Sequence, residues 1–423
     1  MLEPRGIASL ALAAAIACLP LAAQAEGDDP FAPGAFDSAV SSGGSGAAGA
    51  GGMAPAAPGQ GVARTEYLLG GSALVQAVAT LPQGLGGYAA TSFAAGKAFA
   101  KVSVPDYGSL YIAYNFYIPF LEALGGPDYA ALVPPLALGT PTWTVAEAHY
   151  SFDISKRLFV RLGKQLISWG PSLVWNPVDF INPQKADAFS SVDLRAGKPG
   201  LRLHAPLGSA NVFAFLDFSG LVSGSSVNSL GEGLGYGLRL DTTLGGFELG
   251  LTGYGGASSQ AKLGLDFSGY LLGFTAYGDL AWAPGYDSYE QSLKAGLGLS
   301  RTLGELKRLS LSAEAYWQSD GKDLTGDSTT MATKPSLYMG AYYAYAALEA
   351  KEFLSPDLTS KVSVLANLSD YSWRLRLDES LALPRAVPLT LSLSYSGGGA
   401  AKEFTYQAGD GNLSLGIRTL ISF

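Results

Sequence analysis

Residues 373–378 read "WRLRLD", a stretch in which apolar and charged residues alternate without interruption. Successive side chains of a β-strand point to opposite faces, so Trp373, Leu375 and Leu377 would share one face and Arg374, Arg376 and Asp378 the other. A strand of this kind separates an apolar medium from a polar one. The stretch therefore predicts a sheet with one apolar and one charged face.

The same alternation continues along most of the chain. "SLSAEAYW" at 310–317 places Glu314 opposite an apolar row, and two further segments place Arg239 and Lys294 in the same minority position. Eighteen candidate strands follow, at 65–77, 88–104, 107–118, 142–153, 156–167, 192–204, 209–218, 233–243, 246–254, 259–267, 272–282, 291–302, 309–318, 336–348, 359–368, 371–379, 387–396 and 413–423.

The connector lengths alternate as well. Long connectors follow odd-numbered segments, as at 119–141 and 168–191, and short ones follow even-numbered segments, as at 205–209 and 243–246. A soluble sandwich would also alternate in polarity, but long and short loops at opposite ends are typical of membrane barrels. The sequence predicts an all-β, transmembrane, antiparallel up-and-down barrel over 63–423. It has 18 strands, or 16 if two weak N-terminal segments are not strands.

The two ends of the chain indicate export. Arg5, an apolar run over 7–21 and the small-x-small triplet Ala23-Gln24-Ala25 predict a signal peptide over 1–25. Cys18, the only cysteine, would leave with it, unless Cys18 is instead acylated as in a lipoprotein. Residues 26–62 are rich in Gly, Ala, Ser and Pro and predict a disordered periplasmic tether. The terminal Phe423 resembles the C-terminal assembly signal of bacterial outer-membrane barrels.

Composition limits the function. The net charge of −8 argues against a nucleic-acid-binding surface. Only two histidines occur, and neither lies near a nucleophile motif, so we expect no enzyme activity, no cofactor and no metal site. No smooth apolar 20-residue segment is present after the leader, which argues against helical membrane spans.

Charged residues in barrel strands should face the lumen, because a lipid-facing arginine at mid-depth costs about 2–4 kcal/mol. We interpret the neighbouring segments 142–153, 156–167 and 192–204 either as ordinary salt-bridged lining or as a selectivity track that prefers anions. The predicted pore-lining residues are Glu147, His149, Asp153, Arg157, Arg161, Gln165, Asp193, Arg195, Lys198, Arg202 and His204.

The stretch 163–183, "GKQLISWGPSLVWNPVDFINP", interrupts the alternation with tryptophans and Asn-Pro pairs. It predicts a loop that either folds inward and narrows the pore or forms a compact rim, with Trp169 in the outer aromatic girdle or at the rim. The candidate constriction residues are Trp169, Gly170, Trp175, Asn176, Pro177, Asp179, Asn182 and Pro183.

This stretch resembles a segment of the porin and alginate-export-type outer-membrane barrels. The matching residues are Gly163, Lys164, Gln165, Trp169, Gly170, Asn176, Pro177, Asp179, Asn182 and Pro183. The resemblance implies a channel-like barrel, monomeric or loosely oligomeric, without catalytic residues. Alginate-export barrels are strongly basic inside, and the basic excess here is modest, so alginate is not the expected substrate.

We therefore expect an outer-membrane channel or passive transporter of a diderm bacterium, for small polar solutes with anions as one option. The alternative is a structural or adhesive barrel that acts through its extracellular loops. The expected partners are outer-membrane lipids, the barrel-assembly machinery during insertion and small solutes, and the oligomeric state stays open. The N-terminal tail and the C-terminus should be periplasmic.

Overall fold

The structure is a computed structural model. It describes residues 65–83, 88–125, 140–183, 189, 193–222, 233–256, 259–286, 289–304, 308–321, 338–383, 387–399, 402–405 and 411–423. The predicted signal peptide and tether lie outside these ranges.

Eighteen strands and one short helix make up the regular structure of the described residues. The strands are β1 (Glu66–Gln83), β2 (Tyr88–Val104), β3 (Gly108–Gly125), β4 (Thr142–Ile154), β5 (Leu158–Gln165), β6 (Lys198–Leu207), β7 (Ala210–Asp217), β8 (Gly235–Leu244), β9 (Phe247–Gly256), β10 (Ser259–Leu271), β11 (Phe274–Ala283), β12 (Ser292–Leu303), β13 (Leu309–Gln318), β14 (Tyr342–Lys351), β15 (Leu358–Asn367), β16 (Ser372–Leu383), β17 (Val387–Gly397) and β18 (Gly411–Ser422), and the helix α3 is Ser219–Val222.

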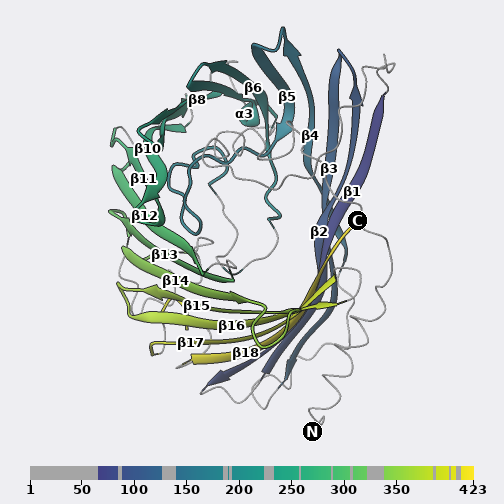
Figure 1. Cartoon of the computed structure of the whole chain (residues 1–423), viewed down its shortest axis with the longest axis vertical. Helices are drawn as coiled ribbons and strands as arrows, with labels where there is room; N and C mark the ends of the chain where they lie inside the picture. The colour runs from purple at the N-terminus through teal and green to yellow at the C-terminus, as the bar shows by residue number, and fades with distance from the viewer. Residues whose placement is uncertain are drawn as a thin grey trace.

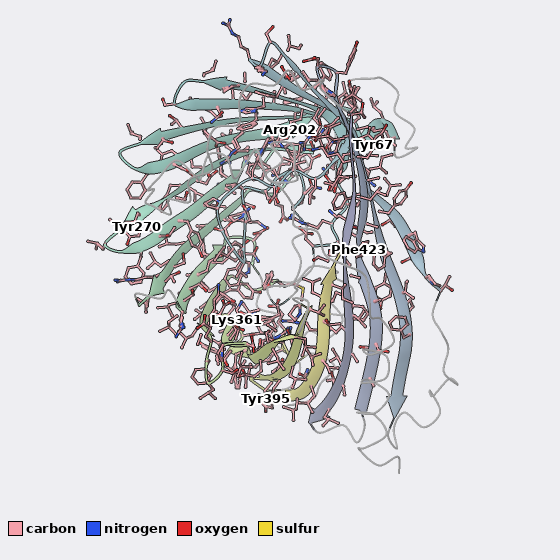
Figure 2. All side chains as sticks on the ribbon, turned by 45° about the vertical axis from the view of Figure 1, so that its right-hand side comes forward. Tyr67, Arg202, Tyr270, Lys361, Tyr395 and Phe423 are labelled. Atoms are coloured by element: carbon pink, nitrogen blue, oxygen red, sulfur yellow. The ribbon has the colours of Figure 1, made fainter. Side chains whose placement is uncertain are left out.

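Each strand pairs antiparallel with its neighbours in sequence, and β1 pairs with β18 from Ser72↔Ser422 to Gln83↔Gly411, which closes the sheet into a barrel. The ladder continues past β18, since the Gly71 N–H donates to the Phe423 carbonyl at 2.7 Å. Phe423 thus lies beside β1 (Figure 2). Figure 1 looks into the resulting ring of strands. The predicted fold class and the count of 18 strands are confirmed.

Two predicted strand starts are wrong. β6 begins at Lys198 instead of 192, and β14 begins at Tyr342 instead of 336. In both places, described residues before the strand bond to side chains of other segments. Arg195 pairs with Asp179, and the N–H of Tyr338 donates to Glu403. Polarity alternation continued into these segments, but regular pairing with the preceding strand begins only at Lys198 and Tyr342.

The pairing register sorts the side chains by face. Glu314, Arg374 and Arg376 lie on the lumen face, whereas outward-facing leucines such as Leu238, Leu297 and Leu391 are exposed. Side chains stand on both faces of the ribbon (Figure 2). Among charged residues of the described strands, those on the outer face are Lys164, Arg301 and Glu379. Within the same ranges, no helix is long and apolar enough to cross a membrane.

Candidate functional site inside the barrel

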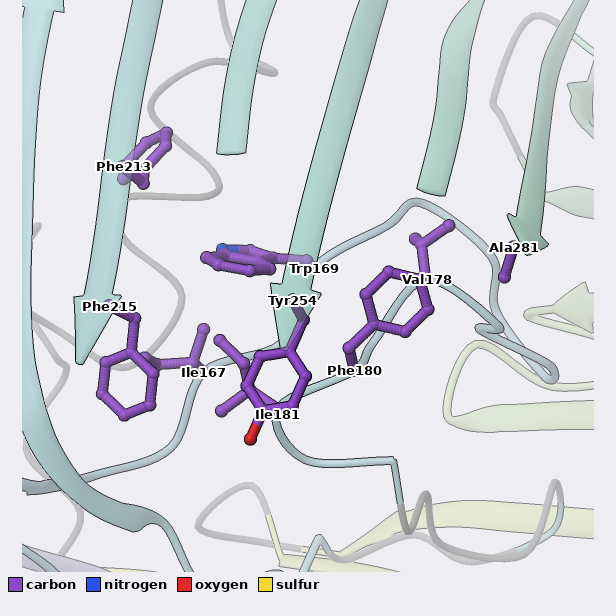
Figure 3. Packing of buried hydrophobic residues seen from close by; sticks show 9 residues of the cluster. All are labelled: Ile167, Trp169, Val178, Phe180, Ile181, Phe213, Phe215, Tyr254 and Ala281. Atoms are coloured by element: carbon purple, nitrogen blue, oxygen red, sulfur yellow. The ribbon is translucent and has the colours of Figure 1, made fainter. Parts of the chain in front are cut away.

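The part of the connection between β5 and β6 that the structure describes lies inside the ring of strands (Figure 1). We call its described part, residues 166–183, the inner loop. Its apolar side chains pack on residues that β7, β9 and β11 direct inward (Figure 3). The cluster comprises Ile167, Trp169, Val178, Phe180, Ile181, Phe213, Phe215, Tyr254 and Ala281. Trp169 is only 2% exposed. It therefore lies against the inner wall, and its placement in an outer aromatic girdle or at the rim is wrong.

The inner loop also reaches the strands further around the barrel. Val174 and Trp175 pack with Tyr316 of β13 and Tyr343 of β14. The rings of Trp175 and Tyr316 stack with centroids 5.5 Å apart and an interplanar angle of 10°. Phe404, from the connection between β17 and β18, joins the same cluster. Aromatic stacking of this kind adds about 0.5–1.5 kcal/mol per pair beyond area burial.

Glycines on the wall make room for the inner loop. A Cβ on Gly264 of β10 would stand 2.8 Å from Val178, and one on Gly237 of β8 would stand 3.2 Å from Trp169. Both glycines face the lumen. A larger side chain at either position would therefore displace the loop or be forced into a strained rotamer.

A buried carboxylate fixes the middle of the inner loop. Glu314 of β13 accepts hydrogen bonds from the backbone N–H groups of Leu173 at 2.9 Å, Val174 at 3.2 Å and Trp175 at 2.7 Å. The Tyr277 hydroxyl donates to the same carboxylate at 3.2 Å. Backbone donors that converge on one anion form a nest, and charge strengthens each bond.

A second wall carboxylate, Asp279 of β11, accepts a hydrogen bond from the Ser172 hydroxyl. Through Ser172 and the Glu314 contacts, the inner loop covers wall carboxylates on both β11 and β13. These positions belong to a larger sector, here called the acidic sector, in which lumen-facing carboxylates outnumber the cations Arg239, Lys262, Lys294 and Lys351. The carboxylates on the lumen face from β8 to β14 are Asp241, Glu248, Asp266, Asp279, Glu314 and Glu349.

Asp179 organises the loop internally. Its carboxylate accepts from Ser168 at 3.0 Å and pairs with Arg195 at 3.1 Å. Burial raises the pKa of Asp179 to about 6, because desolvation of the carboxylate outweighs the attraction of the Arg195 guanidinium. Asn182 ties the two ends together, since its side chain accepts from the Ile167 N–H and donates to the Ala196 carbonyl, both at 3.1 Å.

The turn at Gly170 needs glycine. Its φ is +96°, and a Cβ there would stand 2.3 Å from the Asn176 side-chain oxygen. The Asn176 amide donates to the Gly170 carbonyl at 3.1 Å. The Trp-Gly and Asn-Pro residues singled out in the sequence thus form one compact turn.

Several predicted pore-lining residues lie on the lumen face of β4, β5 and β6. Glu147 is buried, pairs with Lys97 at 3.2 Å and accepts from the Leu166 N–H at 3.1 Å. Lys198 pairs with Asp217 at 3.1 Å. Gln165 donates from its side chain to the carbonyls of Arg161 and Gly200, both at 3.4 Å.

The two histidines and Arg202 belong to aromatic stacks, and Arg161 is hydrogen-bonded beside them. His149 stacks on Tyr111 at 5.2 Å, and His204 stacks on Phe213 at 4.3 Å. Arg202 lies over the Phe213 ring at 5.2 Å, and the Arg161 side chain donates to Ser151 at 3.1 Å. These side chains are held by their neighbours on the wall.

Three predicted positions differ from the expectation, whereas Asp153, near the end of β4, keeps the lumen-facing register. Arg157 lies in the exposed turn between β4 and β5, and Asp153, also exposed, accepts the Lys156 N–H at the same turn at 2.8 Å. Asp193 and Arg195 precede β6 and bond to each other, with Arg195 reaching Asp179. The prediction that Asp193 and Arg195 lie on a wall strand is therefore wrong. Both residues precede β6, and Arg195 bonds to the inner loop.

A basic cavity on another part of the wall was not predicted. It has a volume of about 380 Å³ and lies along β16, β17, β18 and β1. Arg374, Arg376 and Arg418 line it together with serines and Phe189. The described lumen-facing residues of β15–β18 include these three arginines, Lys361 and one carboxylate, Asp378. Asp378 pairs with Arg376 at 2.9 Å and with Arg418 at 3.4 Å, so positive charge remains in excess.

A larger cavity of about 1030 Å³ lies between the inner loop and β10–β13. Lys262 and Lys294 line it, with the small residues Ala281 and Ala283 on the strand between them. Lys294 pairs with Asp320 at 3.2 Å, while the Lys262 ammonium lies over the Phe180 ring at 5.8 Å. The larger cavity thus borders the inner loop, whereas the basic cavity is lined by Phe189 and by residues of β1 and β16–β18.

This architecture defines a closed 18-stranded barrel with a polar lumen and an inward-folded loop. Solved structures with a similar fold include three proteins of Pseudomonas aeruginosa. OccK5 has a TM-score of 0.53 at 6% identity, covering 85% of this chain and 98% of that one. OccK9 has a TM-score of 0.53 at 12% identity, covering 85% of this chain and 98% of that one. OccK7 has a TM-score of 0.53 at 8% identity, covering 85% of this chain and 99% of that one.

Comparison with protein-family models and with curated proteins finds no match. The structural likenesses support the predicted porin-like barrel as a fold. They give no support to the narrower resemblance to alginate-export-type barrels.

Proposed function

We propose that the chain is an outer-membrane channel for passive diffusion of small polar solutes, with a preference for anions. The observation that carries the proposal is the position of the inner loop. It covers Asp279 and Glu314 of the acidic sector and leaves the arginines of β16 and β18 beside open space. Mobile anions would therefore meet a cavity wall on which arginines outnumber carboxylates, whereas cations would find Asp279 and Glu314 already bonded.

The outer wall supports membrane insertion. A row of exposed leucines faces outward, and the charged residues of the described strands lie inside apart from Lys164, Arg301 and Glu379. Both chain ends of the barrel lie at the end that carries the short turns. By the usual loop asymmetry this end is periplasmic, with the lipids of the outer membrane around the wall and the barrel-assembly machinery acting during insertion.

Planar-bilayer recording of the refolded chain tests the channel. We expect stepwise conductance from a preparation whose electrophoretic mobility shifts on heating, as folded barrels do. A folded preparation without steps would contradict the proposal and favour the structural or adhesive alternative.

The anion preference has its own test. Replacing Arg374, Arg376 and Arg418 by Gln should move the reversal potential in a salt gradient toward the cation side. The matched control is Arg161→Gln with Arg202→Gln, because these arginines lie among stacked or hydrogen-bonded wall residues. If only the control moves the reversal potential, the selectivity is on β5 and β6 and the assignment to β16 and β18 is wrong.

A further inference from the structure

The hairpin turns at the short-turn end have an unusual composition. Leucine directly precedes glycine at 207–208, 244–245, 272–273 and 303–304, that is, in every turn from β6–β7 to β12–β13 that follows an even-numbered strand. Leu207, Leu244 and Leu272 are 62%, 69% and 88% exposed. Two-residue turns between strands usually favour Asn, Asp or Gly. This end of the barrel therefore presents an apolar rim, and in the turn between β10 and β11 a leucine occupies a turn position that Asn or Asp usually takes.

The turn between β10 and β11 is the clearest case. Leu272 has φ +52° and Gly273 has φ +85°, the combination that strongly favours Asn-Gly. A leucine there keeps an unfavourable left-handed backbone and also leaves its side chain uncovered. The second disadvantage disappears if the turn lies in apolar surroundings and not in water.

An outward-facing cation lies beside this turn. Arg301 of β12 faces outward, and its guanidinium carbon lies 5.0 Å from the centroid of the Phe274 ring. The same carbon stands 3.2 Å from where a Cβ on Gly273 would be, so the absence of a side chain at 273 lets the guanidinium lie against the turn. No carboxylate pairs with Arg301 within the ranges that the structure describes.

We propose that Arg301, Phe274 and the Leu272 turn form a binding site for the phosphate of an anionic phospholipid. The guanidinium would bind the phosphate, since a planar fork of donors suits this group. The lipid's acyl chains would lie along the outward leucines Leu299 and Leu311, which flank Arg301 on the same outer surface. The site is continuous with the apolar wall, which favours a lipid over a soluble partner. This inference rests on the membrane insertion in the proposed function, but not on conduction.

Native mass spectrometry of the refolded full chain in nonionic detergent tests the site, with dioleoylphosphatidylglycerol and dioleoylphosphatidylcholine as probes. The wild type should retain the anionic lipid in preference. Arg301→Gln should weaken that retention about tenfold, because a charge-assisted contact is lost. Arg308→Gln is the matched control, since Arg308 lies at the same end but already pairs with Glu352. Equal retention by the two variants would overturn the proposal.

A second variant tests the turn. Leu272→Asn suits the turn's backbone and should keep the heat-modifiable barrel intact while lowering lipid retention. Unchanged retention would contradict the role given to the leucine. If soluble glycerol phosphate competes as well as the lipid binds, the acyl chains contribute nothing and the assignment to a lipid fails. Arg301→Gln should leave conductance unchanged, so failure of this inference and failure of the channel proposal are distinguishable.

Discussion

Glu314 provides the sharpest perturbation of the inner loop. Its carboxylate accepts three loop N–H groups, the shortest at 2.7 Å from Trp175, and is nearly inaccessible to water. Glu314→Gln keeps the shape but removes the charge and directs an amide N–H₂ toward donors. A loss of about 1 kcal/mol at each of the three hydrogen bonds weakens docking of the loop by about 3 kcal/mol. This lowers the docking equilibrium constant about a hundredfold.

Single-channel recording is the suitable assay. The variant should show larger mean conductance and frequent transitions between levels, because the loop leaves the wall for part of the time. Glu349→Gln is the control, since Glu349 faces the lumen on β14 but makes no described hydrogen bond to the loop. The reasoning is refuted if Glu314→Gln folds normally, as judged by heat-modifiable mobility, and conducts like the control.

Three further predictions concern the same loop and its surroundings. Gly264→Val should raise conductance, because the added side chain displaces Val178 at a packing cost of about 1–3 kcal/mol. Gly253→Val on the outer face is the control, since a Cβ added there would have its nearest neighbouring atom 3.7 Å away. Equal conductance of the two variants would contradict the packing of Val178 against Gly264. Acidification from about pH 7.5 to about pH 5 should make loop-opening events rarer. As the pH falls, Asp179 is protonated at a pKa of about 6 when the loop is docked but only near 3.8 when it is undocked, so protonation stabilises the docked state. Asp179→Asn should remove this pH dependence. Lys262→Gln should weaken conductance block by a slowly permeating organic anion added on the long-loop side, while Lys198→Gln, whose ammonium pairs with Asp217, should change it less.

The alternation of polarity was sufficient to predict the barrel, because each membrane strand must satisfy lipid on one face and water on the other. It also placed Glu314, Arg374 and Arg376 on the minority face of their strands. The period of two, however, says nothing about which strands a distant loop will contact. The link between residues 173–175 and Glu314 spans about a third of the chain and depends on barrel closure, so sequence reasoning could not find it.

The errors at Asp193 and Arg195 have a local cause. Both residues continue the polar periodicity of the segment that follows, yet Arg195 bonds to Asp179 and to the Asn182 carbonyl. Charge alternation alone does not distinguish a strand from a loop that follows the wall. The Asn-Pro and Trp-Gly residues did predict a loop, because proline and left-handed glycine interrupt a ladder.

The central claim is that the inner loop covers an acidic wall and thereby leaves a basic one to select the solute. Reversal potentials of the wild type and of a variant with residues 171–183 replaced by a Gly-Ser linker test this claim most directly. We predict anion preference in the wild type, and higher conductance with a reversal potential shifted toward cations once Asp279 and Glu314 are uncovered. A folded variant with unchanged conductance and unchanged selectivity would contradict the account.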